Sequence, residues 1–175
     1  MGHAPASLIR LSVLFVQKRP HRAGAQTCLA RLLRHDGLRA GWHPAVVCSQ
    51  PGWLTEECQR HQVTALVEPF PSSRSLGARL FRNAAFARRV AARLAGAGIT
   101  PRIVHANDHL EGLLGLALAR RLKVPAAIFL RSSGMSRADY FKYRCPEHDL
   151  IAVVGDELFA RARAWDDGRE MHLIH

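Results

Sequence analysis

Three polar segments of the chain carry side chains suited to binding sugars and phosphates. Each follows an apolar run typical of a buried strand. A histidine such as His109 can donate to a sugar hydroxyl or a phosphate, and Arg131 is suited to bidentate contact with phosphate or carboxylate. Because the carboxyl ends of parallel strands meet at one edge of a sheet, we expect the three segments to line one ligand crevice. They are His105–His109, residues 131–134 and residues 18–25.

The elements that must position these segments follow from the spacing of apolar residues. We expect strands at 11–16, 45–48, 63–67, from Ile103, 126–130, 150–154 and 171–174, and helices at 25–35, 54–61, 75–97, 110–122, 137–143 and 156–165. This alternation predicts an α/β fold, namely a Rossmann-like, doubly wound, mainly parallel sheet with helices on both faces. Residues 11–175 would form one domain after a disordered or tag-like segment at 1–10. Gly37 and Gly41 are expected to end the first helix.

The composition excludes several classes of protein. A chain of 175 residues with 48% hydrophobic content is long enough to bury a single core. No apolar run approaches the roughly 20 residues of a membrane span, and the start does not resemble a signal peptide. The four cysteines lack Cys-x-x-Cys spacing, so we expect neither zinc nor a redox pair, and a reduced, cytoplasmic setting fits best. Cys28 and Cys48 are expected on apolar faces.

The net charge of +11 rests almost wholly on arginine, which supplies 22 of the 25 basic residues. Such a surface attracts anionic lipid, nucleic acid or phosphorylated substrates. No aromatic stacking platform is evident, which disfavours nucleic acid. The helix expected at 75–97 could contact an anionic membrane surface, with Phe81 and Phe86 adding apolar bulk, although a solvated face is the simpler interpretation. Its arginines are Arg79, Arg82, Arg88, Arg89 and Arg93.

Two motifs admit both a structural and a functional interpretation. Gly24 precedes a helix whose free amides favour phosphate, and a glycine there lets the backbone approach a ligand closely; alternatively, Gly24 only makes the turn. The loop is not a Gly-x-Gly-x-x-Gly fingerprint. Asp108 and Glu111 have the spacing of a capping box, which is a sufficient structural explanation for both. Arg131 could equally form a surface ion pair.

Several segments, in order, resemble the N-terminal domain of family 4 retaining glycosyltransferases, which have the two-domain GT-B fold. The resemblance spans roughly Leu11 to His175, and the loop around Gly24 lies where the family places a glycine-rich loop. Where relatives often have histidine, this chain has Asn107 and Leu110. The segments are Val104-His-Ala-Asn-Asp-His-Leu-Glu-Gly-Leu-Leu-Gly, Val124-Pro-Ala-Ala-Ile-Phe-Leu-Arg131, Leu150-Ile-Ala-Val-Val-Gly-Asp-Glu-Leu158 and Met171-His-Leu-Ile-His175.

The resemblance implies the acceptor-side half of an enzyme that passes a glycosyl group from a nucleotide sugar to a glycan or lipid-linked acceptor. The donor-binding C-terminal half would be absent from this chain, so no turnover is expected from it alone. No metal or cofactor is implied besides the nucleotide-sugar substrate. The implied roles are an approach of Gly24 to the donor diphosphate, catalysis by Asp108 and His109, and acceptor binding by Asn107, Arg131 and Ser132.

Two other functions remain open at this stage. One is a stand-alone flavodoxin-like binding module without catalysis. The other is a basic interaction domain for a membrane surface, which would bind anionic vesicles in a strongly salt-dependent way. Membrane contact is also compatible with transferase activity, at the inner face of a cytoplasmic membrane.

Overall fold

The computed structural model describes residues 11–71 and 76–175, with side chains described for 11–71 and 81–175. The segment expected to be disordered or tag-like (1–10) and the side chain of Arg79 therefore lie outside the described residues. None of the described helices is long and apolar enough to cross a membrane.

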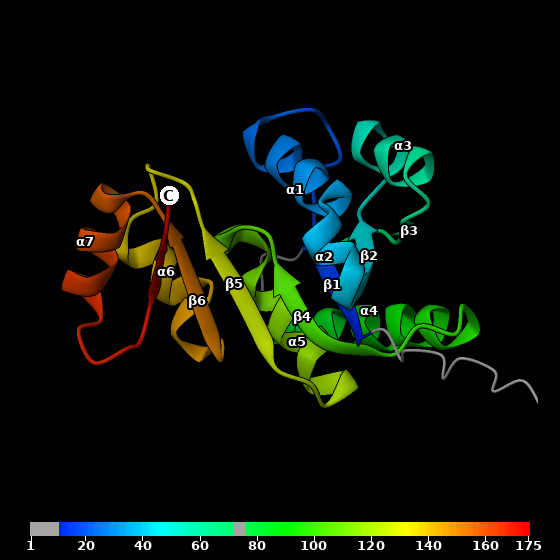
Figure 1. Cartoon of the computed structure of the whole chain (residues 1–175). Helices are drawn as coiled ribbons and strands as arrows, with labels where there is room; N and C mark the ends of the chain where they lie inside the picture. Colours follow the sequence, from blue (N-terminus) through cyan, green and yellow to red (C-terminus); the bar gives the residue numbers. More distant parts are fainter. Residues whose placement is uncertain (1–10, 72–75) are drawn as a thin grey trace, which may run out of the picture.

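A parallel sheet of seven strands organises the chain, in the order β3-β2-β1-β4-β5-β6-β7 (Figure 1). Every described pairing is parallel, so all strands end at the same edge. The order reverses between β1 and β4, which places a topological switch point there. The strands are β1 (Leu11–Gln17), β2 (Trp42–Cys48), β3 (Thr64–Val67), β4 (Pro101–Ala106), β5 (Ala126–Leu130), β6 (Leu150–Val154) and β7 (His172–Ile174).

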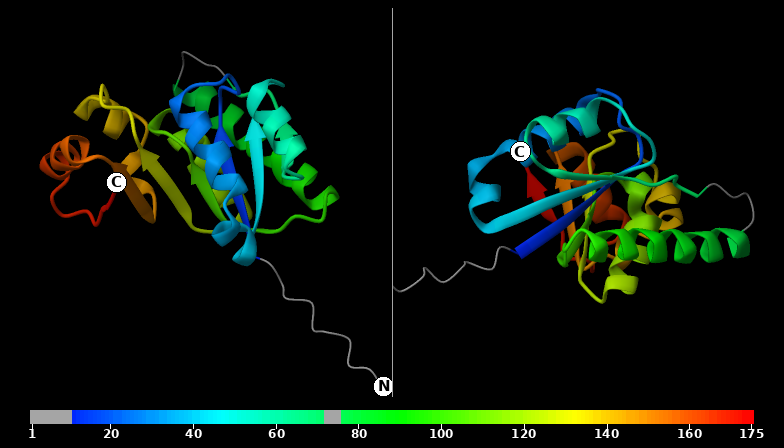
Figure 2. Two further views of the ribbon diagram at one scale, coloured as in Figure 1. Left: turned by 45° about the horizontal axis from the view of Figure 1, so that its top comes forward. Right: turned by 90° about the vertical axis from the view of Figure 1, so that its right-hand side faces the viewer.

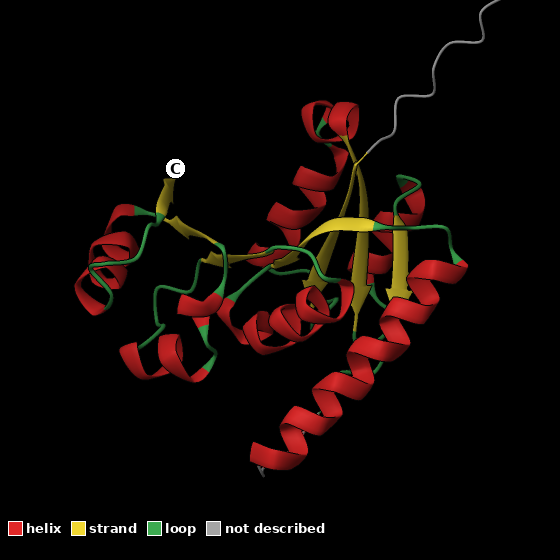
Figure 3. Ribbon diagram, turned by 90° about the horizontal axis from the view of Figure 1, so that it is seen from below, coloured by secondary structure: helices red, strands yellow, loops and turns green. Residues whose placement is uncertain are grey.

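Helices pack on both faces of the sheet because its strands bury alternate side chains to either side (Figure 2). Leu14 of β1 joins one core cluster with Phe86 of α4, whereas Phe15 joins another with Leu29 of α1. Seen from below, α4 and α5 lie on one side of the sheet (Figure 3). The helices are α1 (Gly24–Arg34), α2 (Asp36–Gly41), α3 (Trp53–Arg60), α4 (Leu76–Gly96), α5 (Gly112–Leu122), α6 (Arg137–Lys142) and α7 (Asp156–Trp165), with 3-10 turns η1 (His109–Glu111) and η2 (Cys145–Glu147).

The α/β, Rossmann-like fold predicted from the sequence is confirmed, and the covering of the two faces is unequal. Across β4 to β7, the face that carries α1 is an open apolar trough of about 380 Å³ that includes Phe129 and Ile174. Figure 1 shows β5 and β6 on this side with no helix in front of them. The helices on the opposite face bury that side of the same strands: Ile151 of β6 clusters with Leu158 of α7.

Several local expectations were wrong. Asp36–Gly41 forms a separate helix, α2, because the His35 ring accepts from the amide of Gly37 and so caps a new start. The expected helix at 110–122 opens with the 3-10 turn η1, and η2 was not predicted. Phe86 is wholly buried against Phe70, with ring centroids 5.0 Å apart, so it adds nothing to the basic face. Cys28 is exposed rather than in the core.

The largest difference concerns the polar tip expected at residues 105–109. β4 begins at Pro101 and runs to Ala106, so His105 lies inside the strand. Its ring is buried edge-on between Phe15 (centroids 5.1 Å) and Phe129 (4.4 Å). Burial, reinforced by nearby Arg131 and His148, lowers the pKa of His105 to about 3, so the ring is neutral. The polar segment at the sheet edge therefore begins at Asn107.

Candidate functional site

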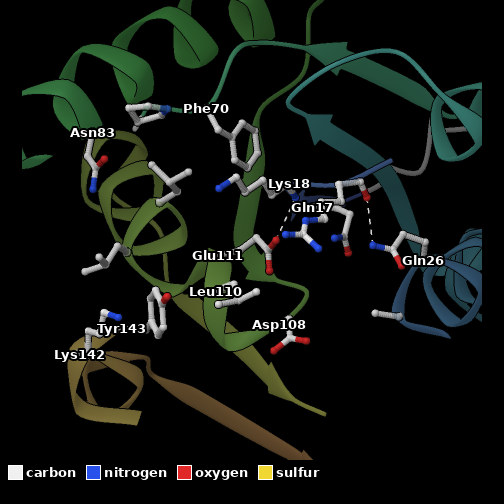
Figure 4. Close-up of a pocket in the computed structure, with 15 residues that line it drawn as sticks. Gln17, Lys18, Gln26, Phe70, Asn83, Asp108, Leu110, Glu111, Lys142 and Tyr143 are labelled. Atoms are coloured by element: carbon white, nitrogen blue, oxygen red, sulfur yellow. Dashed lines mark hydrogen bonds between the residues drawn. The ribbon is translucent and has the colours of Figure 1, made fainter. Parts of the chain in front are cut away.

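A pocket of about 590 Å³ opens at the carboxyl edge of the sheet, beside the switch point between β1 and β4 (Figure 4). One part of its wall is polar, from the ends of β1 and β4. The other part is largely apolar, from α5 and the segment after β3. The lining residues are Gln17, Lys18, Arg19, Ala25, Gln26, Phe70, Pro71, Asn83, Asp108, Leu110, Glu111, Leu113, Leu114, Lys142 and Tyr143.

Asn107 holds the first turn of α1 against the ends of β1 and β4. It is completely buried, and its backbone amide donates to the carbonyl of Val16 at 3.1 Å. Its side-chain Nδ2 donates to Gln17 Oε1 and, at 3.3 Å, to the carbonyl of Ala25. The Asn107 side chain therefore has a structural role, because it connects β1, β4 and α1. Its Oδ1 has no partner among the described residues.

Glu111 is a buried carboxyl that crosses to the loop after β1. Its Oε1 accepts from the backbone amide of Lys18 at 3.0 Å, as Figure 4 shows. Only half of the capping box expected from the spacing with Asp108 is present. Asp108 accepts from the amide of His109, but Glu111 bonds to the loop after β1 instead of returning to the helix start. Burial, aided by the charge of Asp108, raises the pKa of Glu111 to about 7 despite the amide of Lys18. Oε2 has no partner within the described chain.

Asp108 is held by two neighbours at the edge of the pocket. Ser132, just after β5, donates from its hydroxyl to Asp108 Oδ2 at 3.0 Å. His109 pairs with Oδ1 through its ring Nδ1, which fixes the orientation of the imidazole. The His109 ring is buried and rests edge-on against Tyr143, with centroids 5.3 Å apart. Asp108 lines the pocket, whereas His109 stands behind it as a support.

The start of α1 is open. Gly24 is exposed, and a Cβ built on it would meet no atom within 4 Å, nor is its φ in the left-handed region. Neither packing nor backbone strain therefore explains glycine at this position. The N-cap, Ala23, offers no side-chain hydrogen bond, so the first amides of α1 are left for water or a ligand.

Arg131 lies beneath the same helix start. Its Nη1 donates to the carbonyl of Ala25 at 3.0 Å, and its guanidinium lies 4.7 Å from the Phe129 ring centroid. It forms no ion pair within the described chain, which removes the alternative of a surface pair. Nε is buried without a partner. Asn107 and Arg131 thus converge on one carbonyl of α1, next to Gly24.

Buried oxygen atoms without partners gather around the pocket. They belong to Gln26, Asn107 and Glu111. The two residues that line the pocket, Gln26 and Glu111, bond to the backbone of Arg19 and of Lys18, respectively. Each buried polar group without a partner lowers the stability of the fold by about 1–3 kcal/mol. Several such groups in one place therefore indicate that a ligand or ordered water binds there. A ligand that donates several hydroxyl hydrogen bonds would satisfy them.

The structure brings all six predicted site residues to one edge of the sheet, in two linked groups. Gly24, Asn107 and Arg131 surround the first turn of α1, while Ser132 and His109 support Asp108. Sequence reasoning missed Gln17, Gln26 and Tyr143, and it assigned Glu111 only a capping role. A polar residue at the last position of an apolar strand, as Gln17 is, was an available signal. Within the described residues, no three His, Cys, Asp or Glu side chains gather to hold a metal ion.

The fold recurs in solved glycosyltransferase structures. Anabaena HepE in complex with UDP superposes with a TM-score of 0.68 at 15% identity, over 94% of this chain and 44% of that one. Thermosynechococcus elongatus sucrose-phosphate synthase gives 0.64 at 14%, over 94% and 48%. Acinetobacter baumannii MurG gives 0.54 at 13%, over 84% and 42%. The chain thus spans less than half the length of each.

No protein-family model and no curated protein sequence matches the chain. At such low identity the structural likeness defines the fold alone. That fold is one Rossmann-like half of the GT-B glycosyltransferase architecture, and the likeness is consistent with the N-terminal half.

Proposed function

We propose that this chain is the acceptor-side, N-terminal domain of a retaining, nucleotide-sugar-dependent glycosyltransferase similar to family 4. The observation that carries the proposal is a pocket with buried, unpartnered oxygens at the switch point of a GT-B half. The reaction passes a glycosyl group from a nucleotide sugar to a hydroxyl of a glycan or lipid-linked acceptor. The proposal includes no metal and no resident cofactor.

The proposed roles follow from the groups that each residue leaves free. The open backbone at Gly24 approaches the donor diphosphate, because nothing fills the space where a side chain would stand. Asp108, oriented by Ser132 and His109, accepts from sugar hydroxyls at the reacting centre. Asn107 and Arg131 contribute to acceptor binding from the first turn of α1, the arginine through an anionic group of the acceptor.

The donor would be bound mainly by a second half. HepE binds UDP and UDP-glucose in its structures, and this chain corresponds to 44% of that protein. We therefore propose that a donor-binding domain completes the site and that the present chain alone does not turn over. Donor specificity would belong to that domain.

The test separates binding from transfer. Saturation-transfer NMR should detect hydroxyl-rich acceptors on the chain, and His109→Ala and Arg131→Ala should each weaken that binding. Transfer from radiolabelled UDP-sugars, assayed with the donor-binding half supplied, should give a product that keeps the anomeric configuration of the donor. Unchanged acceptor binding in both variants would reject the site, and an inverted product would reject the retaining mechanism.

We further propose a cytoplasmic location, peripheral to the membrane. The arginines of α4 divide into two sets: Arg89 and Arg93 pair with Glu68 at the end of β3, whereas Arg88 lines a groove beside α5. A stand-alone binding module predicts acceptor binding with no transfer under any supply of the donor half, so the same assay distinguishes it. Binding to anionic vesicles that vanishes at high salt would support the membrane contact.

A further inference from the structure

A groove with a volume of about 610 Å³ runs between α4 and α5, on the face of the sheet opposite α1. The two helices pack against each other, and Figure 3 shows both on one side of the sheet. Among the described lining residues, the groove shares only Asn83 and Leu113 with the polar pocket. The groove is therefore a surface of its own, apart from the acceptor pocket.

The floor of the groove is apolar and recessed. Ala87 on α4 and Leu116 on α5 line it, although only 1% and 4% of their surfaces are exposed. Phe81 also lines the groove and is 71% exposed, more than any other large apolar side chain of the described residues. Burying such apolar surface is favourable by about 25 cal/mol per Å². A row of side chains from a single helix can reach a recessed floor, whereas a flat bilayer surface meets only the groups that protrude.

The rim of the groove is cationic. The described lining residues include five cations and no acid, and Glu147 engages two of the five. The other three are exposed and form no ion pair within the described chain: Arg88 on α4, Arg121 in the last turn of α5, and Lys123 at its C-cap. Because these cations stand on both sides of the apolar floor, charge complementarity selects an occupant with acids on both sides of an apolar stripe.

The charge and position of the groove disfavour two other occupants. A second copy of the chain carries a net charge of +11 and would be repelled by the rim. A donor-binding domain would close over the polar pocket at the carboxyl edge of the sheet. Since β4 and β5 are parallel, α5 runs back from that edge to the opposite one, where Arg121 and Lys123 lie. The cations of the groove are therefore directed away from the donor-binding side.

We propose that the α4–α5 groove binds an acidic amphipathic helix of a different protein. The 11 residues of α5 span about 16 Å, so about three turns of a bound helix match its length. Apolar side chains three and four residues apart lie along the floor, and the flanking carboxylates pair with Arg88, Arg121 and Lys123. This inference goes beyond the proposed function, because it holds whether or not the chain belongs to a transferase.

The first experiment measures the binding of labelled peptides to the 175-residue chain by fluorescence anisotropy. Each peptide has about 18 residues, which is long enough to populate a helix. One has leucines three and four residues apart with glutamates on both flanks, and a second has the same residues in an order that leaves no apolar stripe. We expect the first to bind at least about tenfold more tightly, the effect of one well-buried anchor side chain.

A third peptide, with lysine in place of every glutamate, keeps the apolar stripe and should not bind. Equal affinity of the first two peptides would mean that charge alone is recognised. Equal affinity of the first and the third would mean that the cations of the rim play no part. Either result would overturn the proposal.

Two pairs of matched variants locate the acidic peptide. Ala117→Trp fills the groove and should weaken binding by about tenfold or more, whereas Ala160→Trp, at an exposed alanine of α7, should not. Arg121→Glu should weaken it about tenfold, and Arg31→Glu, which makes the same charge change in the last turn of α1 on the other face of the sheet, should leave it unchanged. The charge pair decides the matter if Ala117→Trp does not fold. Equal effects within both pairs would place the peptide elsewhere and overturn the assignment.

Vesicles of phosphatidylcholine and phosphatidylglycerol test lipid as the competing occupant. A membrane contact through the exposed basic surface does not require the groove, so Ala117→Trp should bind these vesicles as the wild type does. If Ala117→Trp abolishes vesicle binding and leaves the acidic peptide bound, the groove belongs to lipid and the proposal is overturned.

Discussion

Two helices of this domain begin with glycine after neighbouring parallel strands, yet the two glycines stand in opposite surroundings. α1 begins at Gly24 and α5 at Gly112. A Cβ at Gly24 would meet nothing within 4 Å, whereas one at Gly112 would lie 2.7 Å from the carbonyl oxygen of Tyr143. The same sequence feature therefore marks an accessible helix start in one region and a close packing contact in the other.

The link between the two regions is Glu111, which directly precedes α5 and accepts from the loop that leads to α1. The start of α5 is fixed by contacts with Tyr143, Ile128 and His148. The start of α1 is held by polar contacts: Asn107 and Arg131 donate to the carbonyl of Ala25, and Gln26 donates to the carbonyl of Arg19. The packed start of α5 is thus the rigid region that positions the loop leading to α1. The open start of α1 is the region accessible to a ligand.

The largest effect is expected from Glu111→Gln. The pKa of Glu111 lies near 7 in the fold against an ordinary value of 4.5, so the folded state holds the proton more tightly than the unfolded state. Its ionisation therefore costs stability as the pH rises from about 4.5 to about 7, on the order of 3 kcal/mol in total. Glutamine keeps an acceptor for the Lys18 amide without the charge.

Urea unfolding from pH 4.5 to 8 measures this effect. The variant should match the wild type near pH 4.5 and exceed it at pH 8. The buried, neutral His105 and His148 act in the opposite direction in both proteins, because their lowered pKa values cost stability as the pH falls below about 6.5. The difference between the two proteins thus isolates Glu111, and a constant difference across the range would contradict the assignment.

Gly112→Ala tests the packed region. The new methyl group would press on the backbone carbonyl of Tyr143 and approach Ile128 Cδ1 at 3.3 Å. Overpacking of this kind costs about 1–3 kcal/mol, which outweighs the gain in helix propensity. The midpoint of urea unfolding should fall accordingly. A variant as stable as the wild type would mean that the start of α5 can move. The contrast between a rigid start of α5 and an open start of α1 would then be wrong.

Asn107→Ala tests the polar brace of the open region. It leaves Gln17 Oε1 without its buried donor and removes one of two donors from the carbonyl of Ala25. We expect a loss of about 1–2 kcal/mol. Faster amide hydrogen exchange should be confined to the first turn of α1. Uniformly faster exchange across α5 as well would show that the two regions are not independent.

Gly24→Ala is expected to have the smallest effect on stability, and with the opposite sign. With no clash and no left-handed backbone, alanine should stabilise the fold by about 0.4–1 kcal/mol through the unfolded chain. Thermal unfolding should show a small rise in Tm, while binding of a diphosphate at this helix start should weaken. A fall in Tm would mean that the fold requires glycine at position 24, contrary to the open space around it.

Much of the fold could be predicted because strands and helices leave periodic apolar patterns. The ranges that the pattern predicts for β1, β5 and β6 agree with the structure to within one residue. The errors fell where tertiary contacts override the local pattern: His105 is polar by type, yet it lies inside β4 because two aromatic rings enclose it. Likewise, Glu111 has the spacing of a cap but finds its partner 93 residues away.

The sequence by itself determined the α/β alternation, the edge at which polar segments gather, and the basic charge, because these depend on composition and short-range periodicity. Only the tertiary structure decided which polar atoms are used up in holding the fold and which remain free. It alone showed that Gly24 is open while Gly112 is packed, and that an apolar groove between α4 and α5 shares Asn83 and Leu113 with the polar pocket. Those properties depend on atoms brought together from distant segments, and burial, which sets both pKa values and ligand access, is defined only once those atoms have met.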